Sequence, residues 1–377
     1  MNKFSRSFIV VFYCLLVVDA NWYQTGGKLY KDGTPVTIHG INWFGLELPS
    51  RAPSGLWTSH QKNGQTIGHS IAWFMSKIRD LGFNTVRIPL SPQGISNNAA
   101  LYPTASWAKQ WDPSLTTGWA VLNSMLTQAQ ASNLYVLIDY QTCNENQTGA
   151  NLPGTPTGCP GYTLNDWMND LNTIAKLTSN FPNVLGIDIF NEPHGISWDT
   201  WRNYADQAIS YIYPSNKNIV YFVEGIDGNV PGDGTGTCWG ENLYYAGNAP
   251  ISANGVPFNK IVYSPHVYDG CDNDWPKCFG YLQGTQSIVI VGEWGYDSQS
   301  SYDVNTFAPN FMNYVHSSGI LSHFYWCFNA NDNQLGYLAG SDPNWCTVVS
   351  EKVNRFKGLG IYPQSYITST NPPSICN

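Results

Sequence analysis

The chain has 377 residues and a formal net charge of −8, and only 12% of its residues are charged. This acidic, charge-poor composition argues against binding of nucleic acid or of an anionic membrane surface. Aromatic residues are abundant, with 15 Trp and 23 Tyr. Core packing accounts for most of these rings, and the remainder are suited to stacking on the apolar faces of sugars.

Residues 1–20 have the features of a secretory signal peptide. Lys3 and Arg6 precede an apolar run over residues 8–18, and a small-residue cleavage site follows it. The run is too short to span a bilayer, which requires about 20 apolar residues. We therefore expect a secreted, extracellular monomer whose residues 21–377 form one domain, because no linker or repeat interrupts them.

Eight short apolar runs along the rest of the chain are typical of buried β-strands. Helical periodicity lies between them: Ile71, Phe74 and Ile78 share one face of a helix predicted over 70–81, and a second helix is predicted over 164–177. The predicted strands are residues 36–43, 85–90, 134–140, 184–190, 219–223, 260–264, 288–292 and 323–328.

Strands that alternate with helices pair in parallel through right-handed crossovers, and eight such repeats close a barrel. The sequence therefore predicts an α/β fold, a single-domain (β/α)8 or TIM barrel. An open, doubly wound sheet is the alternative, but no Gly-x-Gly-x-x-Gly motif follows the first predicted strand.

Cysteine usage agrees with an extracellular protein. Outside the signal peptide eight cysteines remain, and an even number in a secreted chain indicates disulfides that staple its loops. Spacing favours the local pairs Cys143–Cys159 and Cys271–Cys278. Zinc-ligand spacings such as Cys-x-x-Cys are absent from the sequence, so we expect no metal and no cofactor. Asn146 is a predicted glycosylation site in a Gly- and Pro-rich loop.

Two of the predicted strands lead into a glutamate. Glu192 follows residues 184–190 and precedes a proline, and Glu293 follows residues 288–292. A carboxylate beside a buried strand costs free energy unless it is solvated, paired or used in chemistry. Two unrelated loop glutamates are the simpler interpretation, but their matching positions favour a catalytic pair.

In a barrel of parallel strands, the carboxyl ends of all strands lie on one face, where function is concentrated. Other polar or aromatic side chains at these ends should therefore surround the two glutamates in one cleft. They are Asn42, Arg87, Asp139, Gln141, Asn191, Glu224, His266, Tyr268, Trp326 and Asn329.

Two carboxyl groups that flank an acetal can hydrolyse it, because one protonates the departing oxygen while the other faces the developing positive charge. One group must be protonated and the other ionised, and their surroundings decide which is which. We expect Arg87 to supply a compensating charge and Tyr268 a hydrogen bond, both close to Glu293. The pair therefore predicts hydrolysis of glycosidic bonds.

Six strings along the barrel resemble those of glycoside hydrolase family 5, the cellulase family that includes endo-β-1,4-glucanases. They extend from the first predicted strand to the eighth. The Asn-Glu-Pro string, together with a second glutamate in the seventh strand, is highly specific. The strings are GINWFGLE (40–47), NTVRIPL (84–90), IDIFNEPH (187–194), YSPHVY (263–268), VGEWG (291–295) and FYWCFN (324–329).

The resemblance implies a retaining mechanism on a (β/α)8-barrel catalytic domain, with Glu192 as the acid/base and Glu293 as the nucleophile. The two carboxyl groups should then lie about 5–5.5 Å apart. Supporting or substrate-binding roles are implied for a further set: Arg87 and Tyr268 beside Glu293, Asn191 on the sugar 2-hydroxyl, His266 lining the cleft, and Trp326 as a sugar platform.

One position departs from the family pattern. The family usually has a histidine two residues after the acid that ends the third strand, and this chain has Gln141 after Asp139. Glutamine can hydrogen-bond a sugar hydroxyl but carries no charge near neutral pH. We therefore expect a difference from the family in the pH profile or in the binding of the −1 sugar, while both carboxylates remain in place.

Several other residues have two competing interpretations. Tryptophans can form sugar subsites, although most serve packing. His39 could reach the cleft or be a hydrogen-bonded barrel residue, and Glu47 could act in the cleft or in a loop salt bridge. The tryptophan candidates are Trp43, Trp57, Trp239 and Trp294.

The leading hypothesis is a secreted endo-β-1,4-glucanase that cleaves cellulose or a related β-glucan with retention. A β-mannanase or xyloglucanase on the same scaffold is the alternative enzyme, because contacts to single hydroxyl groups separate these activities. A glycan-binding protein without turnover is the alternative from another class. The two glutamates argue against it, and Gln141 is the one feature in its favour.

Overall fold

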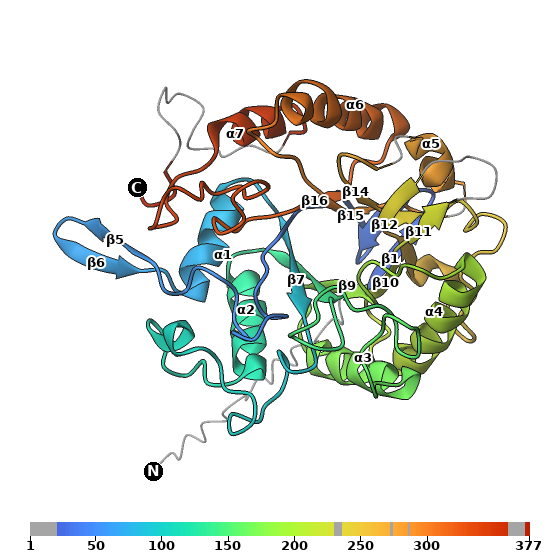
Figure 1. Ribbon diagram of the computed structural model, residues 1–377, viewed down its shortest axis with the longest axis horizontal. Helices are drawn as coiled ribbons and strands as arrows, with labels where there is room; N and C mark the ends of the chain where they lie inside the picture. Colours follow the sequence, from blue (N-terminus) through green and yellow to red (C-terminus); the bar gives the residue numbers. More distant parts are fainter. Residues whose placement is uncertain (1–20, 230–235, 272–273, 286, 361–373) are drawn as a thin grey trace, which may run out of the picture.

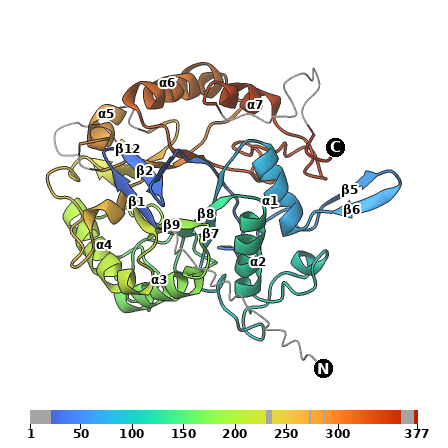
Figure 2. The same cartoon turned by 180° about the vertical axis from the view of Figure 1, so that it is seen from behind.

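The computed structural model describes residues 21–229, 236–271, 274–285, 287–360 and 374–377. The predicted signal peptide lies outside these ranges. The described chain is a (β/α)8 barrel, in which helices form an outer ring around parallel strands (Figures 1 and 2). The predicted fold class is therefore confirmed.

Nine strand segments form the parallel sheet, in the order β13-β10-β9-β8-β7-β4-β16-β15-β14. Tyr263 of β13 also pairs with Val289, just before β15, and this bridge closes the ring. The segments are β4 (His39–Asn42), β7 (Thr85–Leu90), β8 (Tyr135–Tyr140), β9 (Val184–Asp188), β10 (Val220–Val223), β13 (Ile261–Tyr263), β14 (His266–Val267), β15 (Val291–Trp294) and β16 (His323–Tyr325).

The sixth barrel strand consists of two segments, β13 and β14, where the sequence predicted one. Pro265 lies between them, and proline has no amide hydrogen to donate to a strand ladder. Its carbonyl still accepts a hydrogen bond from the amide of Gly292 at 3.0 Å. The break therefore re-aims the chain at the carboxyl end of the barrel and leaves it attached to the neighbouring strand.

Two helices confirm the predicted ones and have side-chain caps. Ser70 accepts a hydrogen bond from the Trp73 amide at the start of α1 (Ile71–Asp80), and Thr163 forms a capping box with Asp166 at the start of α3 (Leu164–Thr178). The other helices are α2 (Gly118–Ala131), α4 (Trp198–Ile212), α5 (Trp275–Cys278), α6 (Ala308–Ser318) and α7 (Ser350–Lys357). None of the helices in the described part of the chain has the length and apolar character needed to cross a membrane.

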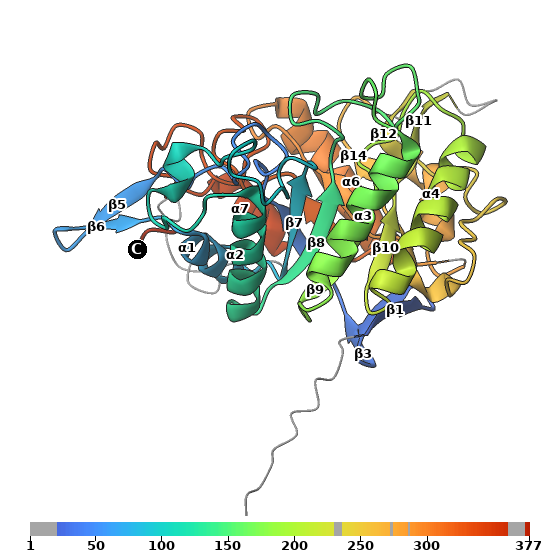
Figure 3. The ribbon, with the colours of Figure 1, turned by 90° about the horizontal axis from the view of Figure 1, so that it is seen from below.

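A small antiparallel sheet covers the amino-terminal end of the barrel. It comprises β1 (Trp22–Thr25), β2 (Lys28–Lys31) and β3 (Thr34–Val36). The sequence had placed Val36 at the start of the first barrel strand, but Val36 belongs to this small sheet. Two hairpins extend from the barrel: β5 (Ser59–Lys62) with β6 (Gln65–Gly68), and β11 (Ile226–Asn229) with β12 (Gly236–Asn242). The second hairpin lies at the opposite end of the molecule from β1 and β3 (Figure 3).

The barrel interior has an apolar floor and a charged upper layer, because side chains alternate between the two faces of each strand. In β8, Val136 and Ile138 pack into the large cluster under the helices, and Leu137 packs into a separate interior cluster. Asp139 follows on the interior side. Other strands contribute to the floor in the same way, through Leu185, Phe222, Val262, Ile290 and Phe324.

Three disulfides connect the loops. Cys143–Cys159 confirms one predicted pair, and Cys346–Cys376 attaches the end of the chain. The predicted Cys271–Cys278 pair is wrong, because Cys271 is bonded to Cys238. Hairpin β11–β12 folds over the barrel and brings these two Cα atoms to 5.2 Å, which spacing along the chain could not predict. Cys278 and Cys327 are buried and lie outside these three disulfides.

Close packing of the floor generates a prediction about Gly40, which pairs with Phe324 across β4 and β16. A Cβ atom on Gly40 would overlap the Phe324 ring. We expect Gly40→Ala to lower the free energy of unfolding by about 1–3 kcal/mol, because overpacking a filled core forces its neighbours to move. Urea unfolding monitored by Trp fluorescence measures this.

Gly236→Ala is the matched control, because a Cβ atom at Gly236 meets no other atom within 4 Å. Similar urea midpoints for the two variants would contradict the packing argument.

Candidate active site

Arg87 occupies the centre of the charged layer. It lies in the middle of β7, points into the barrel and has no exposed surface. Its Nη1 donates hydrogen bonds to Oε1 of Glu293 at 2.5 Å and to Oδ1 of Asn42 at 3.1 Å. Its Nε and Nη2 both donate to Oδ2 of Asp188, at 3.2 and 3.0 Å. One guanidinium group thus connects the first, second, fourth and seventh barrel strands.

The remaining contacts of Arg87 bring more acids into the same layer. Its Nη2 lies 3.1 Å from Oδ1 of Asp139 and 3.2 Å from Oε1 of Glu224. Burial alone would lower the pKa of Arg87, but the carboxylates of Asp139 and Glu293 hold it well above its ordinary value. Burial raises the pKa of Asp139, which the charge of Arg87 offsets only in part. The layer therefore has more acids than its cation can compensate.

Glu293 lies in β15, and each of its carboxylate oxygens accepts a hydrogen bond. Arg87 donates to Oε1, and the hydroxyl of Tyr268 donates to Oε2 at 2.7 Å. The side chain is only 5% exposed. Arg87 and Tyr268 therefore lie beside Glu293, where the sequence predicted them.

Glu192 follows β9 and has an unusual backbone. Its φ angle is 50°, in the left-handed region that costs a non-glycine residue about 1–3 kcal/mol. Its amide donates a hydrogen bond to Oε2 of Glu224 at 2.7 Å. The side chain is 23% exposed, so it is more accessible to solvent than that of Glu293.

His266, in β14, lies between two glutamates. Its Nδ1 is 3.1 Å from Oε1 of Glu192, and its Nε2 is 3.1 Å from Oε1 of Glu224. Burial alone would lower the pKa of His266, but the charges of Glu224 and Glu293 raise it well above the ordinary value. The ring has no exposed surface. The sequence had predicted that His266 lines the cleft, whereas the structure buries its ring within the charged layer, in contact with Glu192.

The two strand-end glutamates are close together. One carboxylate oxygen of Glu192, one of Glu293 and a ring nitrogen of His266 all lie within 4.8 Å of one another. The partners of the two carboxylates differ: Glu293 accepts from a guanidinium and a phenol, and Glu192 faces an imidazole and solvent. Such a pair can offer a fixed anion and an accessible acid side by side.

Three other predicted residues follow the strands β9, β8 and β16 at the carboxyl end of the barrel. Oδ1 of Asn191 accepts a hydrogen bond from Arg87 at 3.2 Å, which orients its side chain. Oε1 of Gln141 is buried and has no hydrogen-bond partner among the described residues. Trp326 stacks on Phe44 with ring centroids 5.6 Å apart, and its Nε1 donates to Asp332.

Trp43 does not reach a cleft, so its prediction as a subsite is wrong. The ring is fully buried against Phe74 and Phe328, and its Nε1 donates to the carbonyl of Ser54. Trp294 is also fully buried. Strand-end position could not separate core rings from cleft rings, because it does not show which way a side chain points.

The remaining tryptophan candidates are exposed, whereas His39 lies in a barrel strand. Trp57 is 38% exposed and Trp239 is 43% exposed, and Trp239 stacks on His194 at 3.7 Å. His39 is the first residue of β4 and pairs with His323, so it lies at the amino-terminal end of the barrel and away from the cleft.

Asp188 is a site residue that the sequence analysis missed. It lies within the apolar run 184–190, where only the residues after the run were considered. The available signal was an acid inside a strand that is otherwise buried, because such an acid requires a partner. Arg87 is that partner.

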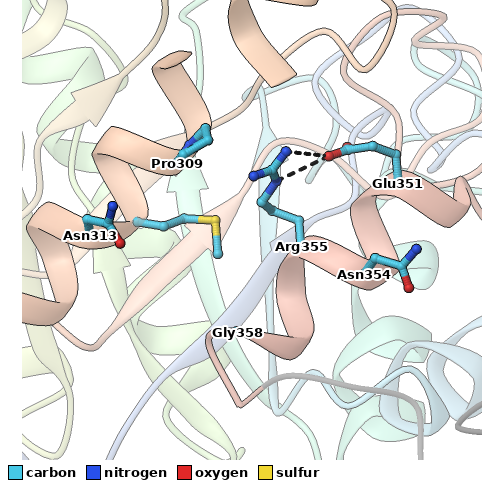
Figure 4. Close-up of a pocket in the computed structure, with 7 residues that line it drawn as sticks. Pro309, Asn313, Glu351, Asn354, Arg355 and Gly358 are labelled. Carbon is cyan, nitrogen blue, oxygen red and sulfur yellow. Dashed lines mark hydrogen bonds and ion pairs between the residues drawn. The ribbon is translucent and has the colours of Figure 1, made fainter. Parts of the chain in front are cut away.

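A separate hollow lies outside the barrel (Figure 4). This cavity of about 430 Å³ is bordered by α6 and α7 residues such as Pro309, Asn313 and Asn354. Glu351 and Arg355 form an ion pair at its edge, 2.8 Å apart. Its lining includes none of the strand-end residues, so it is not part of the candidate active site.

Glu47 generates a prediction about pH. It is 4% exposed, and its Oε2 accepts a hydrogen bond from the Gly45 amide at 2.7 Å. The predicted loop salt bridge of Glu47 is not found among the described residues. Burial raises its pKa to about 7, against an ordinary value of 4.5. A carboxyl group with a raised pKa stabilises the fold at low pH, and that stability is lost as the pH rises through about 7.

We therefore expect Glu47→Gln to be similar in stability to the wild type near pH 4. Near pH 8 it should be more stable by up to about 3 kcal/mol, from 1.36 kcal/mol per pKa unit. Chemical unfolding across this range measures the difference. The control is Asp199→Asn, which removes an acid that is 79% exposed. A constant difference between Glu47→Gln and wild type from pH 4 to 8 would contradict the burial argument.

Comparison with known proteins identifies the relatives of this chain. It is 27% identical to the major extracellular endoglucanase of Xanthomonas campestris pv. campestris, over 87% of this chain and 68% of that protein. It is 29% identical to an endoglucanase of Paenibacillus polymyxa, over 86% of this chain and 84% of that protein.

Solved structures show the same fold. The catalytic domain of the Xanthomonas endoglucanase superposes with a TM-score of 0.77 at 26% identity, covering 90% of this chain and 99% of that domain. The endocellulase of Pyrococcus horikoshii superposes with a TM-score of 0.78 at 22% identity, covering 90% and 98%. The family model "Cellulase (glycosyl hydrolase family 5)" matches residues 29–332. The chain therefore belongs to glycosyl hydrolase family 5, the cellulase family, and is a glycoside hydrolase.

Proposed function

We propose that this protein is a retaining endo-β-1,4-glucanase that cleaves internal bonds of cellulose or a related β-glucan. The observation that carries the proposal is the carboxylate pair, with one oxygen of Glu192 and one of Glu293 within 4.8 Å. Retaining glycosidases have carboxyl groups about 5–5.5 Å apart, whereas inverting enzymes leave about 6.5–9.5 Å for a water molecule. Glu293 is the nucleophile and Glu192 the acid/base.

In the first step, a carboxylate oxygen of Glu293 attacks the anomeric carbon of the −1 sugar. Glu192 gives its proton to the departing glycosidic oxygen, and a covalent glycosyl-enzyme forms. Arg87 and Tyr268 support this role, because together they hold both oxygens of Glu293 and Arg87 places its positive charge beside the anion.

In the second step, Glu192 acts as the base. It takes a proton from a water molecule, which attacks the anomeric carbon and releases Glu293. The partial exposure of Glu192 suits both steps, because the leaving sugar and the water must reach it in turn.

Substrate contacts are proposed for three residues. Arg87 holds the amide oxygen of Asn191, so its amide nitrogen is available to the sugar 2-hydroxyl. Gln141 has a buried amide oxygen without a partner among the described residues, and a sugar hydroxyl would satisfy it. Trp326 provides a ring for stacking on the sugar face.

Secretion is proposed on the signal-peptide pattern of residues 1–20, and the described disulfides suit an oxidising compartment. The Xanthomonas relative is named as an extracellular enzyme. Glycosylation of Asn146 is proposed with it, since the residue is exposed on its loop. The protein should act as a monomer on its polysaccharide.

The activity itself is tested by reducing-sugar release from carboxymethylcellulose, mixed-linkage β-glucan, xyloglucan and mannan. Release from the first two substrates, absent from Glu293→Ala, is the expected result. Release chiefly from mannan or xyloglucan would replace the proposed specificity, and release from none would indicate a binding protein.

The activities of variants at the two glutamates should depend differently on the leaving group of the substrate. Glu293→Ala should abolish turnover of every substrate, because no glycosyl-enzyme can form. Glu192→Ala should lose about 10²–10⁴-fold on β-glucan, the usual contribution of a general acid. It should still form the glycosyl-enzyme from aryl cellobiosides, because their leaving groups need no proton. Steady-state kinetics with both substrate classes measure this, and equal losses in Glu192→Ala would refute the assigned roles.

The stereochemistry of the first product provides a further prediction. Two displacements at one carbon restore its configuration, so hydrolysis of a β-glucan should release the β-anomer first. Proton NMR during the first minutes of the reaction, before mutarotation, distinguishes the two anomers. An initial α-product would exclude the glycosyl-enzyme mechanism.

A further inference from the structure

Glu224 connects the two halves of the site. It follows β10 and has no exposed surface. Its Oε2 accepts a hydrogen bond from the Glu192 amide at 2.7 Å. Its Oε1 lies 3.1 Å from Nε2 of His266 and 3.2 Å from Nη2 of Arg87. The same carboxylate therefore contacts the backbone of Glu192, the imidazole behind Glu192 and the guanidinium that holds Glu293.

Glu224 is itself held firmly in place. Its carbonyl accepts a hydrogen bond from Nε1 of Trp201 at 2.9 Å, in helix α4. Hairpin β11–β12 packs directly on its side chain, because a Cβ atom on Gly240 would lie 2.7 Å from Oε2. The amide of Gly225 also donates to the carbonyl of Gly240 at 2.9 Å. A glutamate whose backbone and side chain are both packed in this way can transmit its position to the groups that its carboxylate contacts.

The backbone of Glu192 requires such an anchor. A left-handed conformation at a non-glycine residue persists only where its surroundings over-determine it. An ionised or hydrogen-bonded carboxylate oxygen is a strong acceptor for the amide of that residue. Through His266, the same carboxylate also orients the partner of the Glu192 side chain, as outer-shell acids do for other functional imidazoles.

We propose that Glu224 is the positioning residue of the acid/base: it holds the Glu192 backbone in its left-handed conformation and, through His266, aims the Glu192 carboxyl group at the leaving-group oxygen. This inference rests on the proposed acid/base role of Glu192. Glu224 does not touch the reacting atoms, so its effect on the reaction passes through Glu192.

The test measures Glu224→Ala on two substrates whose leaving groups differ in their need for a proton. Cellotetraose has a sugar leaving group, which requires acid assistance, and 2,4-dinitrophenyl β-cellobioside does not. We expect kcat/KM of Glu224→Ala to fall by about 10²–10³-fold on cellotetraose and by less than about 10-fold on the dinitrophenyl substrate, because kcat/KM reports the first displacement.

Asn42→Ala is the matched control. Asn42 is equally buried, and its Oδ1 accepts a hydrogen bond from Nη1 of Arg87, the nitrogen that also binds Glu293. Its side chain otherwise donates to the carbonyl of Tyr325, on the far side of Arg87 from Glu224 in the hydrogen-bond network. Its loss should therefore disturb the way Arg87 holds Glu293, the proposed nucleophile, and lower kcat/KM on both substrates by similar factors. The same similar factors in Glu224→Ala would overturn the proposal, because they would mean that Glu224 acts through Arg87 and Glu293.

Two further variants separate the positioning role of Glu224 from a folding defect and from a failure of the acid/base assignment. Glu224→Gln keeps the shape of the side chain and replaces Glu224→Ala if the latter does not fold. Its amide should again lower kcat/KM on cellotetraose more than on the dinitrophenyl substrate. Glu192→Ala is measured in parallel. If Glu192→Ala itself shows no difference between substrates, the acid/base assignment fails; if it does and both Glu224 variants do not, the positioning role alone fails.

Discussion

A guanidinium group without exposed surface at the centre of the barrel is the constraint on which the site depends. Moving an isolated charge from water into a protein interior is costly unless other charges compensate it. Arg87 is compensated by carboxylates from four different barrel strands, among them Asp139, Asp188 and Glu293. Since each of these acids would be costly to bury without Arg87, the layer forms as a unit, and removing Arg87 would leave all of its acids without their shared cation.

This unit gives two identical side chains different properties. Glu293 belongs to the layer and has both oxygens occupied by donors, whereas Glu192 lies at its edge, with its side chain partly in solvent and its amide bound to Glu224. The proposed division of labour between nucleophile and acid/base follows from these positions. A fixed anion needs compensating charge, and a group that exchanges protons with a leaving sugar and with water needs access.

The fold determines where along the barrel axis the charged layer lies. Alternation along the strands places Leu137 below Asp139, and the small sheet β1–β3 covers the barrel from the other end. The charges therefore lie on the carboxyl side of the apolar floor, where the hairpin β11–β12 is attached by Cys238–Cys271. The disulfide holds the hairpin over Glu224, so a loop outside the barrel strands contributes to the packing around the charged layer.

The sequence by itself determined much of the local structure and which residues are candidates for the site. Periodicity predicted helices over 70–81 and 164–177, the alternation of strands with helices predicted the barrel, and matched strand ends selected Glu192 and Glu293, with Arg87 beside Glu293. These features depend on neighbours in the chain or on a repeating geometry. Only the tertiary structure decided that Trp43 is a core residue, that Cys238 pairs with Cys271, and that Glu224 binds the Glu192 amide. Such contacts depend on the path of each loop and the direction of each side chain, which a strand-end position does not contain.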